Sequence, residues 1–193
     1  MIKILFVIIL ITLSTACGSD GKRNYENQNV VFSSEGFKLG NEVLLTEKLD
    51  MIKGKNVALL TNSTGITSGG KHLLDMLAEK GVNVLKIFTP EHGFDSDDTY
   101  NDKNIKIPVI SLYGNNKSFP SGSLNDIDII IYDIQDVGAR FYTYTSTMYL
   151  TLKDAIRQEK KFVVCDRPSV ANLNYTGGFM LDERFSSFVG MIP

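Results

Sequence analysis

Histidine and cysteine are scarce in this sequence, with two residues of each among 193. Structural zinc sites are built from clustered cysteines and histidines, so this scarcity gives a metal site no support. Cys165 lies in an apolar run over residues 161–165, which is typical of a buried strand residue rather than a disulfide partner or a ligand. We expect no metal ion.

Three further absences exclude classes of ligand or chemistry. The formal net charge of −2 is spread along the chain without a basic block, so a nucleic-acid partner is not expected. The turn Asn62-Ser63-Thr64-Gly65 lacks the glycine spacing of dinucleotide and P-loop motifs, which disfavours a nucleotide cofactor. The sequence contains no Gly-x-Ser-x-Gly elbow, so a serine esterase is the weakest functional interpretation. We expect no cofactor.

The N-terminus has the features of an exported protein. Lys3 precedes an apolar run over residues 4–13, and this run is short for a transmembrane helix, which needs about 20 residues. Ser14-Thr15-Ala16 then leads to Cys17, and this segment resembles the lipobox of bacterial lipoproteins. We expect a signal peptide over residues 1–16, lipidation of Cys17 and a polar, flexible tether over residues 17–36.

This lipid anchor predicts a location. It would hold the protein to a membrane of the cell envelope, on the periplasmic face or at the outer membrane of a Gram-negative bacterium. An uncleaved signal anchor is the alternative interpretation of the same N-terminal segment.

Residues 37–193 are expected to form one α/β domain, because a chain of this length can bury one substantial core. Four runs are apolar on both faces, which is typical of buried parallel strands. A fifth run contains Pro108 and is predicted at the periphery of the sheet. The predicted strands lie at 56–61, 82–88, 127–133 and 162–166, the peripheral run at 107–113, and helices between 68 and 81 and at 145–159. This alternation predicts a doubly wound, mostly parallel, Rossmann-like sheet.

In such a sheet, ligands bind beyond the carboxyl ends of the strands, and here polar residues follow each predicted strand. Glu91 is the first candidate for catalysis, because it follows Pro90 on a loop that leaves a buried strand. Apolar neighbours such as Phe94 would favour the protonated carboxyl that a general acid requires. The alternative is an ordinary loop carboxylate.

Asp133 and Asp136 could supply a second catalytic carboxylate. Asp136 also precedes Arg140 by four residues, the spacing of a structural ion pair, and this interpretation competes on equal terms. Arg140 and Arg167 carry rigid, permanently charged guanidinium groups that suit a carboxylate or phosphate on a ligand.

Other polar and aromatic residues at this edge could bind a substrate. The rings of Tyr142 and Tyr144 suit the apolar faces of sugars, although tyrosines at a helix start are more often packing residues. Asn62 and Thr64 could hold an anion or sugar hydroxyls. His92 could bind a ligand or support the loop. The expected substrate-binding residues are Asn62, Thr64, His92, Arg140, Tyr142, Tyr144, Asp166 and Arg167.

Several segments together resemble the exo-β-N-acetylmuramidase family (NamZ type), formerly described as a domain of unknown function. The most specific of them is the block from Asp133 to Tyr144. The others are Gly40 to Leu45, Leu60 to Gly65, Pro90 to Phe94, Pro108 to Gly114 and Asp166 to Pro168.

The resemblance implies a glycoside hydrolase that releases N-acetylmuramic acid from the non-reducing end of peptidoglycan fragments, so its partners would be muropeptides or disaccharides. It implies that Glu91 is the catalytic residue, and it gives the arginines a carboxylate to bind. It also implies a smaller C-terminal domain, so residues 37–193 are expected to be a Rossmann-like catalytic domain that is incomplete at its C-terminus. A catalytically inactive lipoprotein that binds muropeptides is the alternative.

Overall fold

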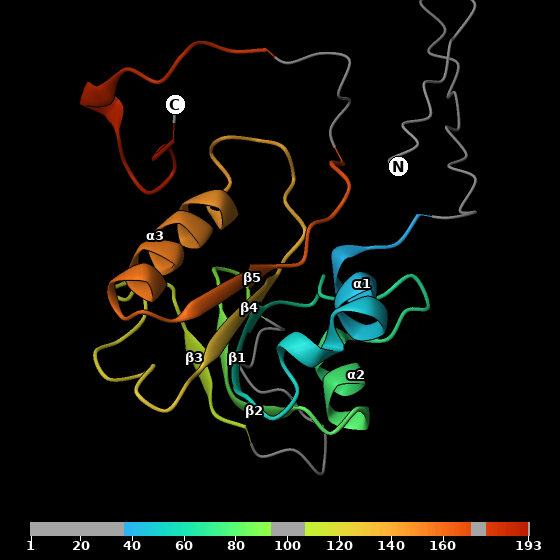
Figure 1. Cartoon of the computed structure of the whole chain (residues 1–193). Helices are drawn as coiled ribbons and strands as arrows, with labels where there is room; N and C mark the ends of the chain where they lie inside the picture. Colours follow the sequence, from blue (N-terminus) through green and yellow to red (C-terminus); the bar gives the residue numbers. More distant parts are fainter. Residues whose placement is uncertain (1–36, 94–106, 171–176, 193) are drawn as a thin grey trace, which may run out of the picture. The chain divides into compact units, whose positions relative to one another are not determined.

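The computed structural model describes residues 37–93, 107–170 and 177–192 (Figure 1). The predicted signal peptide, Cys17, the tether and Phe94 lie outside the described residues. No helix in the three described ranges has the length and hydropathy needed to cross a membrane.

Five parallel strands form one sheet in the order β3-β2-β1-β4-β5. From β1 the chain adds β2 and β3 on one side and then β4 and β5 on the other, which confirms the predicted doubly wound α/β fold. The winding direction changes between β1 and β4, where such folds leave a crevice for ligands. The strands are β1 Asn56–Thr61, β2 Asn83–Thr89, β3 Val109–Ser111, β4 Ile129–Asp133 and β5 Lys161–Val164.

The predicted bounds of β1 are confirmed, and β3 lies at an edge, as Pro108 indicated. The prediction for the last strand is wrong in two respects. It ends at Val164 rather than Asp166, and it is not buried, since Val164 is 47% exposed. β5 forms the other edge of the sheet, where one side of a strand has no neighbouring strand to cover it.

Side chains alternate along β1 and build a core on each face of the sheet. Val57 and Leu59 pack on the side of α1 (Gly40–Glu47) and α2 (Leu73–Glu79). Ala58 and Leu60 pack on the side of α3 (Tyr144–Arg157). Figure 1 shows α1 and α2 on one face and α3 on the other. Each fully buried leucine contributes roughly 1.5–3 kcal/mol, so the central strand is the most stable support for the loops that follow it.

Of the three α-helices in the described residues, two were predicted and one was missed. α3 is close to its predicted range, and its buried residues are Tyr144, Ser146, Thr147, Thr151 and Ala155. The Thr151 hydroxyl donates to the Thr147 carbonyl at 2.7 Å, which allows a threonine on a buried face. α1 was not predicted, because it has only 8 residues and its buried face includes a polar side chain, Asn41.

Candidate functional site

A pocket of about 490 Å³ opens beside Glu91, and we call it the Glu91 pocket. A hollow of about 250 Å³ shares Glu91 and Thr143 with it. The pocket is lined by Glu91, Tyr113, Gly114, Lys117, Thr143, Ser187, Phe188 and Val189, and the hollow by Glu91, His92, Phe141, Tyr142, Thr143 and Val189. The predicted loop after β2 and the predicted tyrosine segment therefore meet at one place.

A tight turn at the end of β2 holds Glu91. The Gly93 amide donates to the Pro90 carbonyl at 3.1 Å, and His92 adopts a positive φ of 70°. A non-glycine residue in this region costs about 1–2 kcal/mol, so the neighbouring structure must hold the turn. The Thr143 hydroxyl donates to Glu91 Oε2 at 3.1 Å. Glu91 is thus half-buried with one carboxylate oxygen oriented by a hydroxyl from the start of α3.

The two predicted tyrosines lie side by side but in different surroundings. Tyr142 lines the hollow, and its ring meets that of Tyr144 at 4.8 Å and 75°. Tyr144 is buried, and its hydroxyl accepts from Asn62 Nδ2 at 2.9 Å. Burial raises the pKa of Tyr144 to about 12, so the phenol stays protonated at neutral pH. This geometry makes Tyr142 available to a ligand and places Tyr144 behind it as support.

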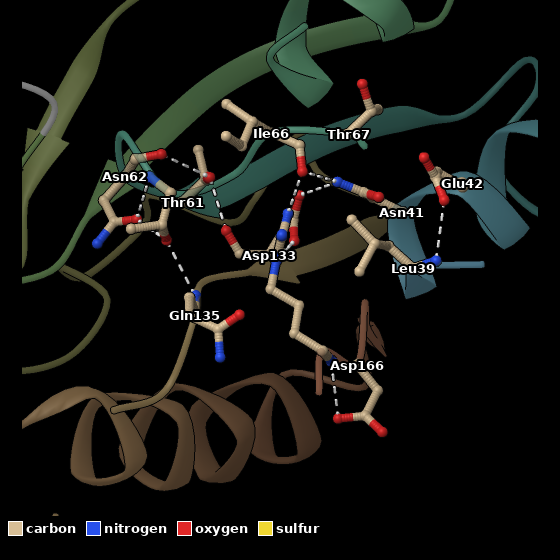
Figure 2. A network of polar contacts seen from close by, with 12 residues as sticks. Leu39, Asn41, Glu42, Thr61, Asn62, Ile66, Thr67, Asp133, Gln135 and Asp166 are labelled. Atoms are coloured by element: carbon tan, nitrogen blue, oxygen red, sulfur yellow. Dashed lines mark hydrogen bonds and ion pairs between the residues drawn. The ribbon is translucent and has the colours of Figure 1, made fainter. Parts of the chain in front are cut away.

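A second polar cluster lies between β1, β4 and the residues after β5, and we call it the buried network: Asn41, Thr61, Asp133, Arg167 and the Ile66 carbonyl (Figure 2). Arg167 Nε donates to Asp133 Oδ1 at 2.7 Å, and Asn41 Nδ2 donates to Asp133 Oδ2 at 3.0 Å. The side chains of Asp133 and Arg167 are 0% and 6% exposed. Each carboxylate oxygen of Asp133 therefore has a donor, and the charge is neutralised by its partner.

This geometry changes the roles expected of Asp133 and Arg167. Asp133 is sealed from solvent, and Arg167 also donates from Nη2 to the Ile66 carbonyl at 3.0 Å. Neither side chain presents a free edge to a substrate. These contacts favour a structural role for both residues, and the catalytic role of Asp133 and the ligand-binding role of Arg167 stay predictions.

Backbone contacts position the buried network. Thr61 and Asp133 are register partners at the ends of β1 and β4, and the Thr61 hydroxyl donates to the Asp133 carbonyl at 2.7 Å. The Gly40 amide donates to the Asp166 carbonyl at 2.8 Å. A Cβ at residue 40 would lie 2.3 Å from the Asp166 nitrogen, so only glycine allows α1 to approach this closely. Exposed Asp166 turns its own carboxylate to the Arg167 amide, at 3.0 Å.

The turn after β1 is also occupied by internal contacts. Asn62 Oδ1 accepts from the Thr64 amide at 3.0 Å, and the Thr64 hydroxyl accepts from the Gln135 amide at 3.0 Å. His72 also contacts this turn. Its Nε2 lies 3.0 Å from the Asn62 carbonyl, and its Nδ1 accepts from the Leu74 amide at 3.2 Å. Burial lowers the pKa of His72, in agreement with a neutral ring that donates once and accepts once. The side chains of Asn62 and Thr64 are thus engaged in contacts within the chain.

Asp136 and Arg140 do not form the ion pair that their spacing allowed, as far as the described residues show. Asp136 Oδ2 accepts from the Gly138 amide at 2.9 Å, and Arg140 donates to the Phe179 carbonyl at 2.8 Å. Asp136 Oδ1 is buried and has no hydrogen-bond partner among the described residues. Asp136 thus keeps one uncommitted carboxylate oxygen, whereas Arg140 is exposed and engaged elsewhere.

The structure also brings in residues that the sequence did not single out. Thr143 contacts Glu91, Asn41 completes the buried network, and Lys117 and Tyr113 line the Glu91 pocket. Three of them lie in segments that carry the family resemblance: Asn41 in Gly40 to Leu45, Tyr113 in Pro108 to Gly114, and Thr143 between the two predicted tyrosines. Lys117 had no such signal. Within 37–93, 107–170 and 177–192, no three histidine, cysteine or acidic side chains are grouped so that they could hold a metal ion.

The fold and site define a doubly wound α/β domain with a carboxylate-bearing pocket at the carboxyl edge of its parallel sheet. Residues 57–193 match the family model described as "Exo-beta-N-acetylmuramidase NamZ, N-terminal", and the chain belongs to this family.

Relatives of known name or structure agree with this assignment. The chain is 34% identical over 176 residues to the peptidoglycan beta-N-acetylmuramidase NamZ of Bacillus subtilis (strain 168), covering 87% of this chain and 42% of that protein. One crystal structure of a DUF1343 family protein from Bacteroides fragilis NCTC 9343 has a TM-score of 0.74 at 37% identity, with coverage of 80% and 40%. A second from the same organism has a TM-score of 0.70 at 38% identity, with coverage of 81% and 41%. The chain therefore spans about two fifths of the length of these relatives.

Proposed function

We propose that this chain forms the substrate-binding and acid-bearing domain of an exo-acting glycoside hydrolase that releases N-acetylmuramic acid from peptidoglycan fragments. The observation that carries the proposal is the Glu91 carboxylate, oriented by Thr143 and facing a pocket with aromatic and hydroxyl groups. A sugar needs such a mixture, because its ring faces are apolar and its rim is polar. The similarity to the Bacillus protein supports the choice of substrate.

In this proposal, Glu91 is the general acid. Its protonated carboxyl donates a proton to the glycosidic oxygen as the bond to the anomeric carbon breaks, so the leaving sugar departs as an alcohol. A second group must then direct water to the anomeric carbon or form a covalent intermediate. Asp136 or an activated water is the candidate, because Asp133 is paired with Arg167, whereas Asp136 Oδ1 has no partner among the described residues, although it is buried and Asp136 lines neither the pocket nor the hollow. Tyr142 and His92 line the adjoining hollow and can contact the sugar.

The proposal includes location. Cys17 would carry the lipid after removal of residues 1–16, and residues 17–36 would place the domain within reach of peptidoglycan in the cell envelope. Metabolic labelling with a radioactive fatty acid tests this step: the intact chain should be labelled, and Cys17→Ala should abolish the label. Labelling that persists in Cys17→Ala would contradict the assignment.

Hydrolysis of a chromogenic β-N-acetylmuraminide tests the proposed activity. Glu91→Gln keeps the size of the side chain but cannot donate an acidic proton, so kcat should fall by about 10²–10⁴-fold. The loss should be smaller with a nitrophenol leaving group than with a sugar leaving group, because nitrophenolate departs with little protonation. Glu79→Gln is the matched control, since Glu79 pairs with Lys71 on the surface and lines neither the pocket nor the hollow.

Binding of N-acetylmuramic acid, measured by calorimetry on the same variants, separates the two functional classes. Turnover that is lost in Glu91→Gln while binding is kept supports the hydrolase. Binding without turnover in the unsubstituted chain and in both variants supports a muropeptide-binding protein instead.

A further inference from the structure

Among the described residues, one cationic side chain lines the Glu91 pocket, and it is Lys117. Its Nζ lies 4.8 Å from the centre of the Phe188 ring, another lining residue. No carboxylate of the described chain forms an ion pair with it. The pocket thus combines an acid at Glu91, aromatic surface and a cation available to a ligand.

Three contacts fix the loop that carries Lys117. The Ser118 hydroxyl donates to Asp154 on α3, which ties the adjacent residue to the helix. Phe119 is buried, and its ring contacts that of Phe88 on β2 edge-to-face at 4.7 Å. The loop begins at Leu112, which is fully buried. Because the chain is held on both sides of Lys117, the ammonium is presented near the pocket without a large ordering cost on binding.

The arginines expected to bind an acid group are engaged elsewhere. Arg167 donates to Asp133 and to the Ile66 carbonyl, and its side chain is 6% exposed. Arg140 donates to the Phe179 carbonyl and lines neither the Glu91 pocket nor the hollow. A ligand carboxylate in the Glu91 pocket would therefore meet Lys117 rather than either arginine.

We propose that Lys117 binds the carboxylate of the lactyl ether on the sugar and so selects N-acetylmuramic acid over N-acetylglucosamine. This inference rests on the proposed function, and it assigns substrate selection to Lys117 and proton donation to Glu91. The two sugars differ by the lactyl group alone, so a single cation in the pocket can distinguish them. Since Lys117 is exposed, the contact should weaken as salt is added.

Calorimetric binding tests this proposal without requiring turnover. The probes are N-acetylmuramic acid, its methyl ester and N-acetylglucosamine, each titrated into the full chain. Lys117→Met should weaken binding of the acid by about 10- to 100-fold, the range expected for a contact with a charged group. Binding of the ester and of N-acetylglucosamine should stay unchanged, and Lys117→Arg should restore most of the affinity for the acid.

Lys153→Met is the matched control, because Lys153 also lies over an aromatic ring, that of Tyr149 at 5.2 Å, but does not line the pocket. Three outcomes overturn the proposal: equal weakening for all three ligands, no weakening for the acid, or no preference for the acid in the unsubstituted chain. Failure of the hydrolase proposal would look different, because turnover would be absent while the preference for the acid and its dependence on Lys117 remained.

Discussion

Asp133 and Glu91 are two carboxylates at the same edge of one sheet, yet their surroundings differ in every respect. Asp133 ends β4 and is 0% exposed, with donors on both oxygens. Glu91 comes two residues after the end of β2, is half-buried and, among the described residues, accepts from Thr143. The first is a satisfied internal group, and the second is a group that a ligand can reach.

Position at the end of a strand therefore does not by itself make a carboxylate accessible to a ligand. A buried ion pair costs a great deal to break, because the remaining charge is left in a medium that solvates it poorly. Such a pair can hold together α1, β1, β4 and the segment after β5. The carboxylate beside an open pocket can change its protonation state and its partner, as catalysis requires. Substitutions in the two regions should therefore affect different measurements.

The largest effect is expected from Arg167→Met. It leaves the Asp133 carboxylate buried without its cation, so the free energy of unfolding should fall by about 3–5 kcal/mol. Chemical denaturation followed by circular dichroism measures this loss. Arg184→Met is the control, because Arg184 pairs with Asp182 in an exposed position, and its unfolding midpoint should hardly move.

A second substitution sharpens the interpretation of this loss. Adding Asp133→Asn to Arg167→Met removes the buried charge, so the double variant should be more stable than Arg167→Met alone. A single variant as stable as Arg184→Met would show that the network does not hold the fold together.

Gly40→Ala should have the next largest effect. The new Cβ would lie 2.3 Å from the Asp166 nitrogen and 2.6 Å from the Cys165 carbonyl carbon, and backbone atoms cannot rotate away. We expect a loss of about 1–3 kcal/mol in the free energy of unfolding, typical of an overpacked contact. Gly69→Ala is the control, since its Cβ would meet only the Thr67 hydroxyl, at 3.8 Å. Equal stability of the two variants would contradict the close approach of α1.

The pH dependence of stability should report His72. Burial lowers its folded pKa, so the unfolded chain binds a proton more readily as the pH falls below about 6.5. Stability should thus be constant above this pH and decrease below it, by at most about 1.4 kcal/mol per pH unit, until the folded pKa is reached. His72→Asn should remove this slope between pH 7.5 and 5.5 while still accepting from the Leu74 amide. If the slope persists in His72→Asn but vanishes in His92→Gln, then His92 rather than His72 causes it, and the prediction is wrong.

The sheet was predictable from sequence because its signals are local. Apolar runs bounded by polar turns located the central strands, and Pro108 located the edge at β3. The prediction for β5 was wrong because its apolar run was interpreted as a buried strand, whereas β5 is an edge strand with one side uncovered. α1 was missed because its buried face includes Asn41, whose partner Asp133 lies 92 residues away.

The site was predictable only where its residues follow strands. Glu91 and Tyr142 were found by this rule and do line adjoining hollows. The rule could not tell that Arg167 would contact Asp133 rather than a ligand. Asp133 ends β4 and Arg167 follows β5, and only the neighbouring positions of these strands bring the two side chains together. Lys117 had no signal at all, since it lies in a loop after an edge strand whose path is set by the burial of Phe119.

The smallest effect is expected from Thr143→Val, which removes the hydroxyl that orients Glu91 and keeps the shape of the side chain. Stability should fall by about 1 kcal/mol, since one hydrogen bond is lost. If the hydroxyl holds Glu91 toward the glycosidic oxygen, kcat on the chromogenic muraminide should fall roughly tenfold while KM changes little. Thr143→Ser should restore kcat, because it returns the donor without the methyl group. A loss of stability with unchanged kcat would show that Thr143 has a structural role, as Asp133 has, and does not orient Glu91 for catalysis.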